Sequence, residues 1–392
     1  MEINHLQTSG IFRLKFITDF ESFFAARGEF HNLEFTLDRI KTAAAEAGID
    51  DSIAGRTVHI AGTNGKGSTA YFIEQILTHR GLTTALFTSP HILNITERIR
   101  LNGSDIPAEL FNEYFHKLKP LIIRHKLSYF EGLTLIAYRY YKDNMPDVAI
   151  IETGLGGRLD STNILEKKIP VITTISKDHV EYLGDDILKI ADEKLGIIQN
   201  NLLAFVGANS EYMNKYLDYK LHSKTIVRGN YSDESYMGFE APFSNNLRLA
   251  ETVCGYIVTG AMPETLELPP CRDERIGRFI LDGAHNEDGL AKLAARFRDK
   301  KPVAVFSTTK DRDTLALLET VKSFASETIL TSIPGSDRSI DVNSITTNTL
   351  KEQNPEKALK IAVELSENAD ILVCGSLYLC AFAREILKKG ML

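Results

Sequence analysis

The sequence of 392 residues predicts an α/β protein whose sheets are mostly parallel. Short apolar runs of strand length alternate along the chain with amphipathic stretches of helical length, as in strands joined by crossover helices. The alternation occurs in an early and a late series, and the chain exceeds the usual size of a single core. We therefore expect a larger domain with a mostly parallel sheet and a smaller, Rossmann-like α/β domain at the C-terminus.

Apolar runs define the expected strands. The early strands cover residues 57–62, 83–89, 147–153 and 170–176, and the late strands cover residues 278–283, 301–307, 327–333 and 370–376. Between the two series lies a polar stretch, 207–245, in which we expect few regular elements. Consecutive prolines in "ELPPC" suit a linker. We therefore assign residues 1–267 to the first domain, 268–271 to the linker and 272–392 to the second domain.

The composition is that of an ordinary globular protein, with 43% hydrophobic residues, 25% charged residues and a formal net charge of −7. This mild acidity argues against a general binder of nucleic acid or of anionic membranes. The cysteines form no CxxC pair and the N-terminal residues lack the pattern of a signal peptide, so we expect a reducing cytoplasm. No apolar run approaches about 18 residues, so we expect no membrane span.

The segment "AGTNGKGST", residues 61–69, follows an expected strand and opens an amphipathic helix. Its glycines permit a tight loop whose backbone N–H groups can surround phosphate oxygens. Lys66 supplies a positive charge, and the Ser68 hydroxyl can reach a phosphate or its magnesium ion. A glycine-rich turn alone can be only a turn, but a lysine and a serine at this spacing predict nucleotide binding.

Polar side chains also follow the other early strands. Ser89 lies in "TSPH", Glu152 opens "ETGLGGRLDSTN" and His179 ends "KDH". Because ligands bind at the carboxyl ends of parallel strands, these groups are expected beside the phosphate loop. Each residue has an ordinary structural interpretation when it is taken alone. Together they are the oxygen and nitrogen ligands that suit Mg²⁺ or Mn²⁺.

The segment "DILKIADEKLGII", residues 186–198, has helical spacing, and one charged residue lies on its apolar face. Lys194 falls between Ile187 and Ile190, whereas the other charges lie outside the apolar stripe. From this pattern alone we favour a lysine that snorkels to the surface or pairs with a carboxylate. A lysine that stayed buried would have a lowered pKa, because burial disfavours the ammonium form.

Eight short motifs occur in a characteristic order: "HIAGTNGKGST", "TSPHILNITERIR", "SYFEGLTLIA", "IIETGLGGRLDSTN", "ISKDHVEYLG", "IADEKLGII", "ILDGAHNEDGL" and "GSLYL". This set resembles the folylpolyglutamate synthase and dihydrofolate synthase branch of the Mur ligase family. The resemblance runs from about residue 30 to 385 and is dense in 58–198 and 278–290. It implies an ATP-dependent ligase in which a carboxylate becomes an acyl phosphate that the amino group of L-glutamate attacks.

The resemblance also implies roles for individual residues. Those implied to bind ATP are Gly62, Thr63, Asn64, Gly65, Lys66, Gly67, Ser68, Asn246, Arg272, Asp282 and His285. Two Mg²⁺ sites, which Mn²⁺ can also occupy, are implied at Ser89, Glu152, His179 and Lys194. Lys194 occupies the position of a carbamylated lysine in this family, and Lys66, His179 and Lys194 are the implied catalytic residues. On this basis we favour the carbamate over the snorkelling lysine.

The sequence departs from the family pattern in three places. Phe243 stands where a glutamine is usual before the asparagine that corresponds to Asn246, and Cys271 replaces the glycine of a "PGR" segment before Arg272. The stretch 195–245 is also shorter than expected. Adenine recognition is therefore open, whereas the phosphate and metal residues are all present.

Several alternatives follow from these observations. The substrates implied are dihydropteroate or a reduced folate together with L-glutamate, and the length of the glutamate tail is open. A Mur-type ligase of a cell-wall precursor and a nucleotide- or folate-binding homologue without turnover are the competing interpretations. The resemblance implies a monomer. We expect the charges of "KDRD", 310–313, to cap a helix, and Tyr129 and Phe130 to belong to the core rather than to a pterin pocket.

Overall fold

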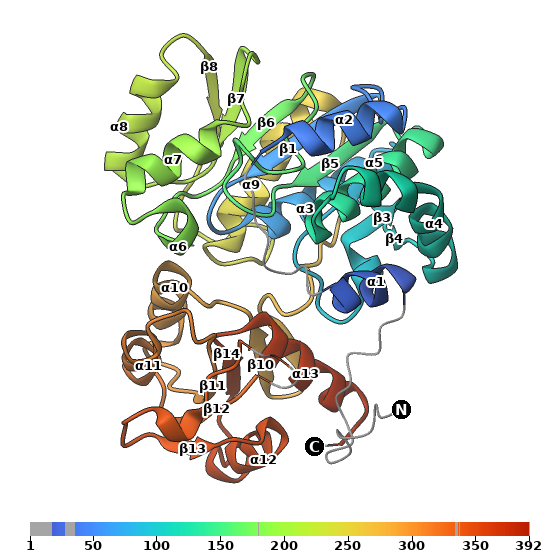
Figure 1. Cartoon of the computed structure of the whole chain (residues 1–392). Helices are drawn as coiled ribbons and strands as arrows, with labels where there is room; N and C mark the ends of the chain where they lie inside the picture. The colour runs from blue at the N-terminus through green and yellow to red at the C-terminus, as the bar shows by residue number, and fades with distance from the viewer. Residues whose placement is uncertain (1–17, 28–35, 179, 334–335, 337, 392) are drawn as a thin grey trace, which may run out of the picture. The chain divides into compact units, whose positions relative to one another are not determined.

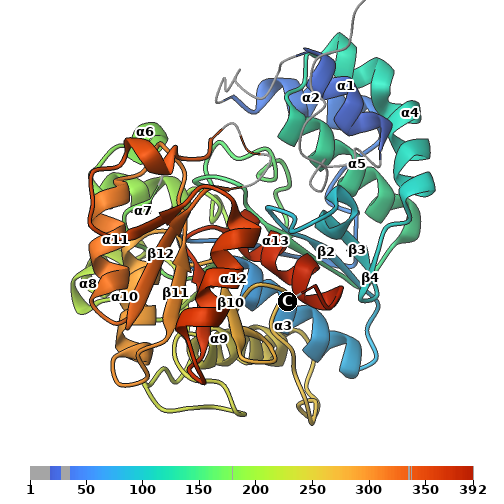
Figure 2. The same cartoon turned by 90° about the horizontal axis from the view of Figure 1, so that it is seen from below.

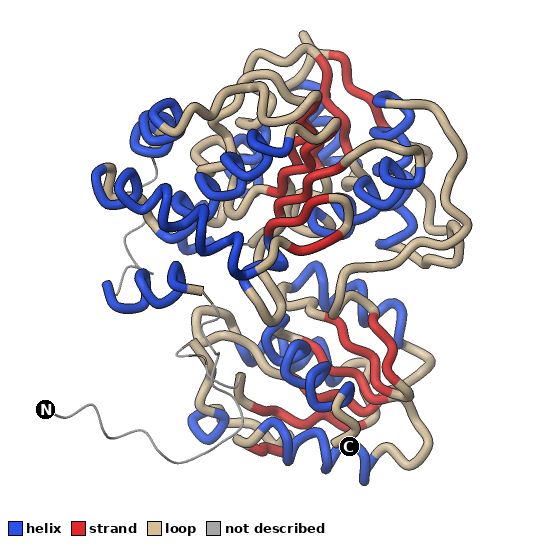
Figure 3. Tube along the Cα trace, turned by 90° about the vertical axis from the view of Figure 1, so that its right-hand side faces the viewer, coloured by secondary structure: helices blue, strands red, loops and turns tan. Residues whose placement is uncertain are grey.

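The computed structural model describes residues 18–27, 36–178, 180–333, 336 and 338–391. These residues form two compact units, which divide between Pro269 and Pro270. In Figure 1 the first unit runs from blue to yellow and the second from orange to red. Each unit contains its own sheet, and Figure 3 draws the strands of both sheets in red.

The described part of the first unit contains an eight-stranded sheet with the order β4-β3-β2-β5-β1-β6-β7-β8. Its strands are β1 (Arg56–Ala61), β2 (Thr84–Phe87), β3 (Ile99–Leu101), β4 (Ser104–Asp105), β5 (Val148–Glu152), β6 (Ile169–Ile172), β7 (Leu203–Val206) and β8 (Thr225–Arg228). The strands β2, β5, β1, β6, β7 and β8 pair in parallel, in that order across the sheet. The strands β3 and β4 add an antiparallel edge next to β2.

Helices cover both faces of this sheet. One face of its central strands packs on α3 (Lys66–His79) and α9 (Phe243–Ile257). The other face packs on α4 (Ala108–Arg124) and α5 (Tyr129–Asn144), with α1 (Asp19–Arg27) and α2 (Asp38–Glu46) in the same hydrophobic cluster. Farther along the sheet lie α6 (Val180–Leu183), α7 (Ile187–Leu195) and α8 (Glu211–Lys220). Because both faces are covered, the central strands are continuous apolar runs rather than alternating ones.

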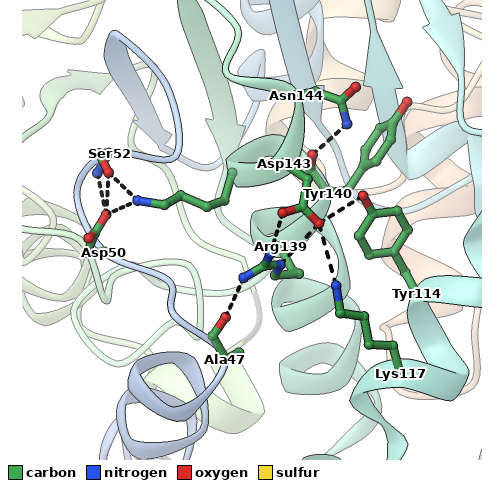
Figure 4. Close-up of polar contacts among 10 residues, drawn as sticks. Ala47, Asp50, Ser52, Tyr114, Lys117, Arg139, Tyr140, Asp143 and Asn144 are labelled. Atoms are coloured by element: carbon green, nitrogen blue, oxygen red, sulfur yellow. Dashed lines mark hydrogen bonds and ion pairs between the residues drawn. The ribbon is translucent and has the colours of Figure 1, made fainter.

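The helix α5 is fixed at both ends. At its start the Ser128 hydroxyl accepts the backbone N–H of Glu131 while the Glu131 carboxylate accepts that of Ser128, which forms a capping box. Near its end Arg139 pairs with Asp143 (Figure 4), and Lys142 donates to Asp50 at 2.7 Å. The Lys142 hydrogen bond, together with those of Ser52, holds the pKa of Asp50 below its ordinary value and joins α5 to the loop after α2.

The described part of the second unit has a six-stranded sheet with the order β13-β12-β11-β14-β10-β9. Its strands are β9 (Glu274–Ile276), β10 (Phe279–Asp282), β11 (Val303–Phe306), β12 (Glu327–Thr331), β13 (Leu350–Glu352) and β14 (Ile371–Cys374). All pairs are parallel except that of β9 with β10. The helices α10 (Glu287–Phe297) and α11 (Thr314–Lys322) lie on one face of this sheet, and α12 (Pro355–Leu365) and α13 (Leu377–Lys388) lie on the other (Figure 2).

The predicted α/β class with mostly parallel sheets is confirmed. The polar stretch 207–245 differs from the expectation, because it contains both α8 and β8. Tyr129 and Phe130 pack against the core, and Asp313 caps α11 by accepting the Ala316 backbone N–H at 3.1 Å, as expected. None of the described helices is long and apolar enough to cross a membrane.

Candidate active site

The glycine-rich loop connects the end of β1 to the start of α3, as the sequence predicts. A Cβ added at Gly62 would lie 1.8 Å from Thr173 Oγ1, so only glycine lets the loop approach β6 this closely. Gly65 has φ +85° and lies against Asn246, whose Oδ1 would be 2.5 Å from a Cβ there. These contacts explain two of the glycines and place the predicted residue Asn246 beside the loop.

Hydroxyl groups after β6 hold the loop in place. Thr173 Oγ1 donates to Asn64 O at 2.8 Å, and Thr63 Oγ1 donates to Ser176 O at 2.9 Å. Sequence reasoning did not single out Thr173 or Ser176, although a run of hydroxyl residues at the end of an apolar strand was a usable signal. The segment that follows β6 therefore holds the loop through hydrogen bonds to Asn64 and Thr63.

The amino end of α3 is open to an anion. The N-cap residue, Gly65, has no side chain that could cap this end, and the first turn contains no acidic residue. The first N–H groups of a helix lack partners within the helix and carry a partial positive charge, which favours phosphate. Lys66, the first residue of α3, donates from Nζ to Gly62 O and Thr63 O at 3.1 Å each.

Glu152 and Ser89 meet beside the loop. Glu152 ends β5, which lies between β1 and β2 in the sheet, and its side chain is buried with the residue 4% exposed. The backbone N–H of Ser89 donates to Glu152 Oε2 at 3.1 Å. A Cβ added at Gly67 would lie 3.4 Å from the same oxygen. The strand ends therefore place a carboxylate and a serine next to the first turn of α3.

Lys194 points into the protein rather than toward solvent. It lies in the last turn of α7, is 3% exposed and donates from Nζ to Gly62 O at 2.9 Å. Burial lowers the pKa of Lys194 to about 7, and the positive charge of Lys66 contributes to the shift. The helix pattern alone favoured a lysine that snorkels to the surface or pairs with a carboxylate, and the burial of Lys194 shows that the first of these alternatives is wrong. Two lysine side chains donate to the same backbone oxygen of the phosphate loop.

Asp160 is a buried carboxylate that sequence reasoning did not select, although it lies within the "ETGLGGRLDSTN" motif. Its Oδ2 accepts the Leu155 N–H at 2.8 Å, and its Oδ1 accepts the Thr162 N–H at 3.0 Å. Burial raises the pKa of Asp160, and these hydrogen bonds oppose the rise. Its charge weakly opposes the lowered pKa of Lys194.

Predicted residues of the second unit gather at the end of β10. Asp282 is buried, and its Oδ1 accepts the Ala284 N–H at 2.9 Å. Burial raises the pKa of Asp282, whereas the neighbouring Arg272 lowers it. His285 Nδ1 lies 2.8 Å from Gly283 O. Arg272, Asp282 and His285 therefore form one polar cluster within this unit.

The predicted metal ligands are only partly described. His179 lies outside the described residues. Within the described part of the chain, no group of three or more His, Cys, Asp or Glu side chains is arranged to hold a metal ion. The predicted ligand set differs from such a group, because it also uses a serine and a lysine.

The fold and the site together define a nucleotide-binding α/β protein in which the phosphate loop adjoins a carboxylate and a buried lysine. Residues 60–241 match the Mur ligase middle domain. The dihydrofolate synthase/folylpolyglutamate synthase of Bacillus subtilis is 30% identical, over 90% of this chain and 95% of that protein. The folylpolyglutamate synthase of Lacticaseibacillus casei is 28% identical, over 86% of this chain and 91% of that protein. The chain therefore belongs to the folylpolyglutamate synthase/dihydrofolate synthase family.

Solved structures show the same similarity. E. coli FolC in complex with DHPP and ADP has a TM-score of 0.82 and 25% identity, over 95% of this chain and 98% of that chain. A bifunctional folylpolyglutamate synthase/dihydrofolate synthase with Mn, AMPPNP and L-glutamate bound has a TM-score of 0.81 and 26% identity, over 94% of this chain and 98% of that chain.

Proposed function

We propose that this chain is an ATP-dependent ligase that joins L-glutamate to a carboxylate of a pteroate or folate substrate. The observation that carries the proposal is the hydrogen bond of buried Lys194 to Gly62 O, in a phosphate loop that also adjoins Glu152. Family membership supports the choice of substrates, because relatives bind DHPP with ADP, and AMPPNP with L-glutamate.

The reaction requires activation, because the oxygen of a carboxylate is a poor leaving group. Transfer of the γ-phosphoryl group of ATP to the substrate carboxylate gives an acyl phosphate and ADP. The amino group of glutamate then attacks the acyl carbon, phosphate leaves with the bonding electrons and the amine loses a proton. The N–H groups of residues 62–68 and the Lys66 ammonium hold the phosphates and stabilise their charge during transfer.

The residues present fit a divalent metal ion, since the Glu152 carboxylate and the Ser89 hydroxyl are oxygen donors at the edge of the phosphate loop. Mg²⁺, or Mn²⁺ in its place, would neutralise charge on the phosphates. We assign Ser89 and Glu152 to one metal and His179 to a second, with Glu152 near both.

Lys194 is the residue that we assign to carbamate formation. Its lowered pKa leaves part of the side chain as a neutral amine near pH 7. The nitrogen lone pair attacks the carbon of CO₂, an N–C bond forms and one proton leaves the nitrogen for solvent. The product is an anionic carbamate, which converts an unfavourable buried cation into an oxygen ligand beside the phosphate loop.

Four further predicted residues are assigned to ATP in this proposal. Asn246 lies on α9 of the first unit, and Arg272, Asp282 and His285 belong to the second unit. We further propose a monomer that works in the cytoplasm. The four cysteines, Cys254, Cys271, Cys374 and Cys380, are buried and free, which suits a reducing compartment.

The experiment that tests the function is coupled ADP release with dihydropteroate and with tetrahydrofolate, each with and without L-glutamate. We expect ADP release that needs both a pterin substrate and glutamate, and a product heavier by one glutamate residue in mass spectrometry. Turnover with a UDP-muramyl substrate instead would identify a cell-wall ligase. Tight nucleotide binding without turnover on any substrate would identify a homologue that only binds.

A further inference from the structure

We propose that Asn163 and Arg158 are positioning residues for Lys194. Residues 153–163, here called the latch loop, follow β5 and pack against the last turn of α7, which carries Lys194. The inference rests on the proposed function, because it concerns how the chain places the carbamate-forming lysine. It assigns a role to the part of the "ETGLGGRLDSTN" motif that follows Glu152.

The backbones of the latch loop and α7 are in direct contact. The Arg158 N–H donates to Glu193 O at 2.7 Å. A Cβ added at Gly157 would lie 2.9 Å from Glu193 O and 3.0 Å from Lys194 O. A Cβ added at Gly196 would lie 2.2 Å from the Arg158 Cβ. Gly157 in the latch loop and Gly196 after α7 therefore allow the two backbones to pack closely. Any larger residue at either position would push the two segments apart.

Asn163 joins three segments with one side chain. Its Nδ2 donates to Gly196 O at 3.2 Å and to Arg158 O at 3.0 Å. Its Oδ1 accepts from the Nζ of Lys168, a buried lysine that also donates to Leu165 O at 2.8 Å. Because Lys168 Nζ donates to Oδ1, the oxygen of the Asn163 amide faces Lys168 and its NH₂ group faces α7.

A second contact lies on the solvent side of the latch loop. Arg158 Nε and Nη2 donate to Glu193 Oε1 at 3.0 and 2.7 Å. Both side chains are partly exposed, so the pair adds little to stability. Its geometric effect is to hold the residue immediately before Lys194.

The latch loop also contacts β1, the strand that leads into Gly62, whose backbone oxygen accepts the Lys194 hydrogen bond. Within the loop, Thr162 Oγ1 donates to Asp160 and lies 2.8 Å from the Nε2 of His59 on β1. Since β1 leads into Gly62, the same loop contacts the segment that bears Gly62 O and the helix that bears Lys194. It thereby sets the position of one relative to the other.

This position matters because a metal ligand works only within a narrow range of geometry, about 0.5 Å. Groups that orient a ligand without touching the metal typically change metal affinity or activity by about 10-fold to 100-fold when removed. We therefore expect variants of Asn163 to lower the stability of the carbamate.

The test is ¹³C NMR of the full-length chain in buffer with ¹³C-bicarbonate and magnesium. The wild type is expected to show a carbamate resonance that is missing in Lys194→Ala. Asn163→Asp keeps the shape and the Lys168 contact but loses both donations, so we expect about 10-fold more bicarbonate for half occupancy. Arg158→Ala, at a partly exposed site, is expected to shift the bicarbonate dependence in the same direction without unfolding the protein.

The matched control is Asn201→Asp. The Asn201 Nδ2 also donates to a carbonyl near the end of α7, Ile198 O at 2.8 Å, and to Glu166 O at 3.4 Å, and both acceptors lie outside the latch loop. We expect this variant to retain the wild-type carbamate occupancy. Wild-type bicarbonate dependence in folded Asn163→Asp and Arg158→Ala would overturn the positioning role alone. Absence of the resonance from the wild type would overturn the carbamate assignment and the positioning role together.

Discussion

At the scale of single residues, Lys66 and Lys194 donate to the same backbone oxygen, Gly62 O, from two different helices. Placing two cations on one carbonyl is unfavourable, and burial adds to the cost for Lys194, as its lowered pKa indicates. We therefore predict that substitution of Lys194 has opposite effects on stability and on activity. The effect of the substitution on the free energy of unfolding should become smaller as the pH rises, because the pKa of Lys194 is lowered in the folded chain.

We predict that Lys194→Met raises the free energy of unfolding at pH 6 in buffer depleted of CO₂. The pKa of Lys194 is lowered from 10.5 to about 7 in the folded chain, so between these values the unfolded state binds more protons. The wild-type penalty is complete below about pH 7 and disappears as the pH rises toward 10.5. At about 1.4 kcal/mol per pKa unit, the gain at pH 6 is on the order of a few kcal/mol.

Urea unfolding of both proteins at pH 6 and pH 9 measures this effect. The difference between the variant and the wild type should shrink at the higher pH. Lys168 also has a pKa lowered to about 7, but it is present in both proteins and cancels in the comparison. A variant that is less stable than the wild type at pH 6 would contradict the assigned burial cost.

At the scale of elements, the site is an arrangement of strand ends. The loop after β1, Glu152 at the end of β5 and the hydroxyl groups after β6 come from three neighbouring strands. The loop can follow β6 so closely only because residue 62 is a glycine. The arrangement predicts that nucleotide binding is sensitive to a single methyl group at that position.

We predict that Gly62→Ala weakens binding of a nonhydrolysable ATP analogue by at least about tenfold, the loss expected when about 1.4 kcal/mol is removed. The added Cβ would lie 1.8 Å from Thr173 Oγ1 and force the loop away from β6. Gly81→Ala is the control, because Gly81 has φ +81° but no atom within 4 Å of an added Cβ. Its strain should cost about 1 kcal/mol of stability and leave nucleotide affinity unchanged. Equal affinities in both variants, measured by calorimetry, would exclude the close approach as the reason for Gly62.

At the scale of the whole molecule, all four cysteines are buried and free. Burial raises the pKa of Cys271 to about 12 and raises that of the other three as well, so thiolate is scarce at neutral pH. We predict that no cysteine of the native protein reacts with a thiol reagent within minutes. After denaturation, all four cysteines should react, consuming four equivalents of the reagent. A reducing agent should not change the melting temperature. Rapid reaction of a native thiol would show that one of these regions opens readily.

The fold class was readable from the sequence because strands covered on both faces are continuous apolar runs. The strand β8 could not be predicted from the sequence, because it is a short, half-buried edge strand in a polar stretch. The phosphate loop and Glu152 could be predicted from local motifs. The partner of Lys194 could not, because Gly62 lies 132 residues away and helical periodicity carries no information about what a buried side chain contacts. The latch loop, likewise, is defined by contacts between segments rather than by its own composition.

The central claim is that this chain is a ligase whose buried lysine works as an anion beside the phosphate loop. The measurement that tests it most directly is glutamate-dependent ADP release by Lys194→Ala, with and without acetate. We predict that the variant loses activity and that acetate, which supplies a carboxylate in place of the carbamate, partly restores it. Acetamide has a similar shape without the charge and should not restore activity. Full activity in the variant without acetate would contradict the claim.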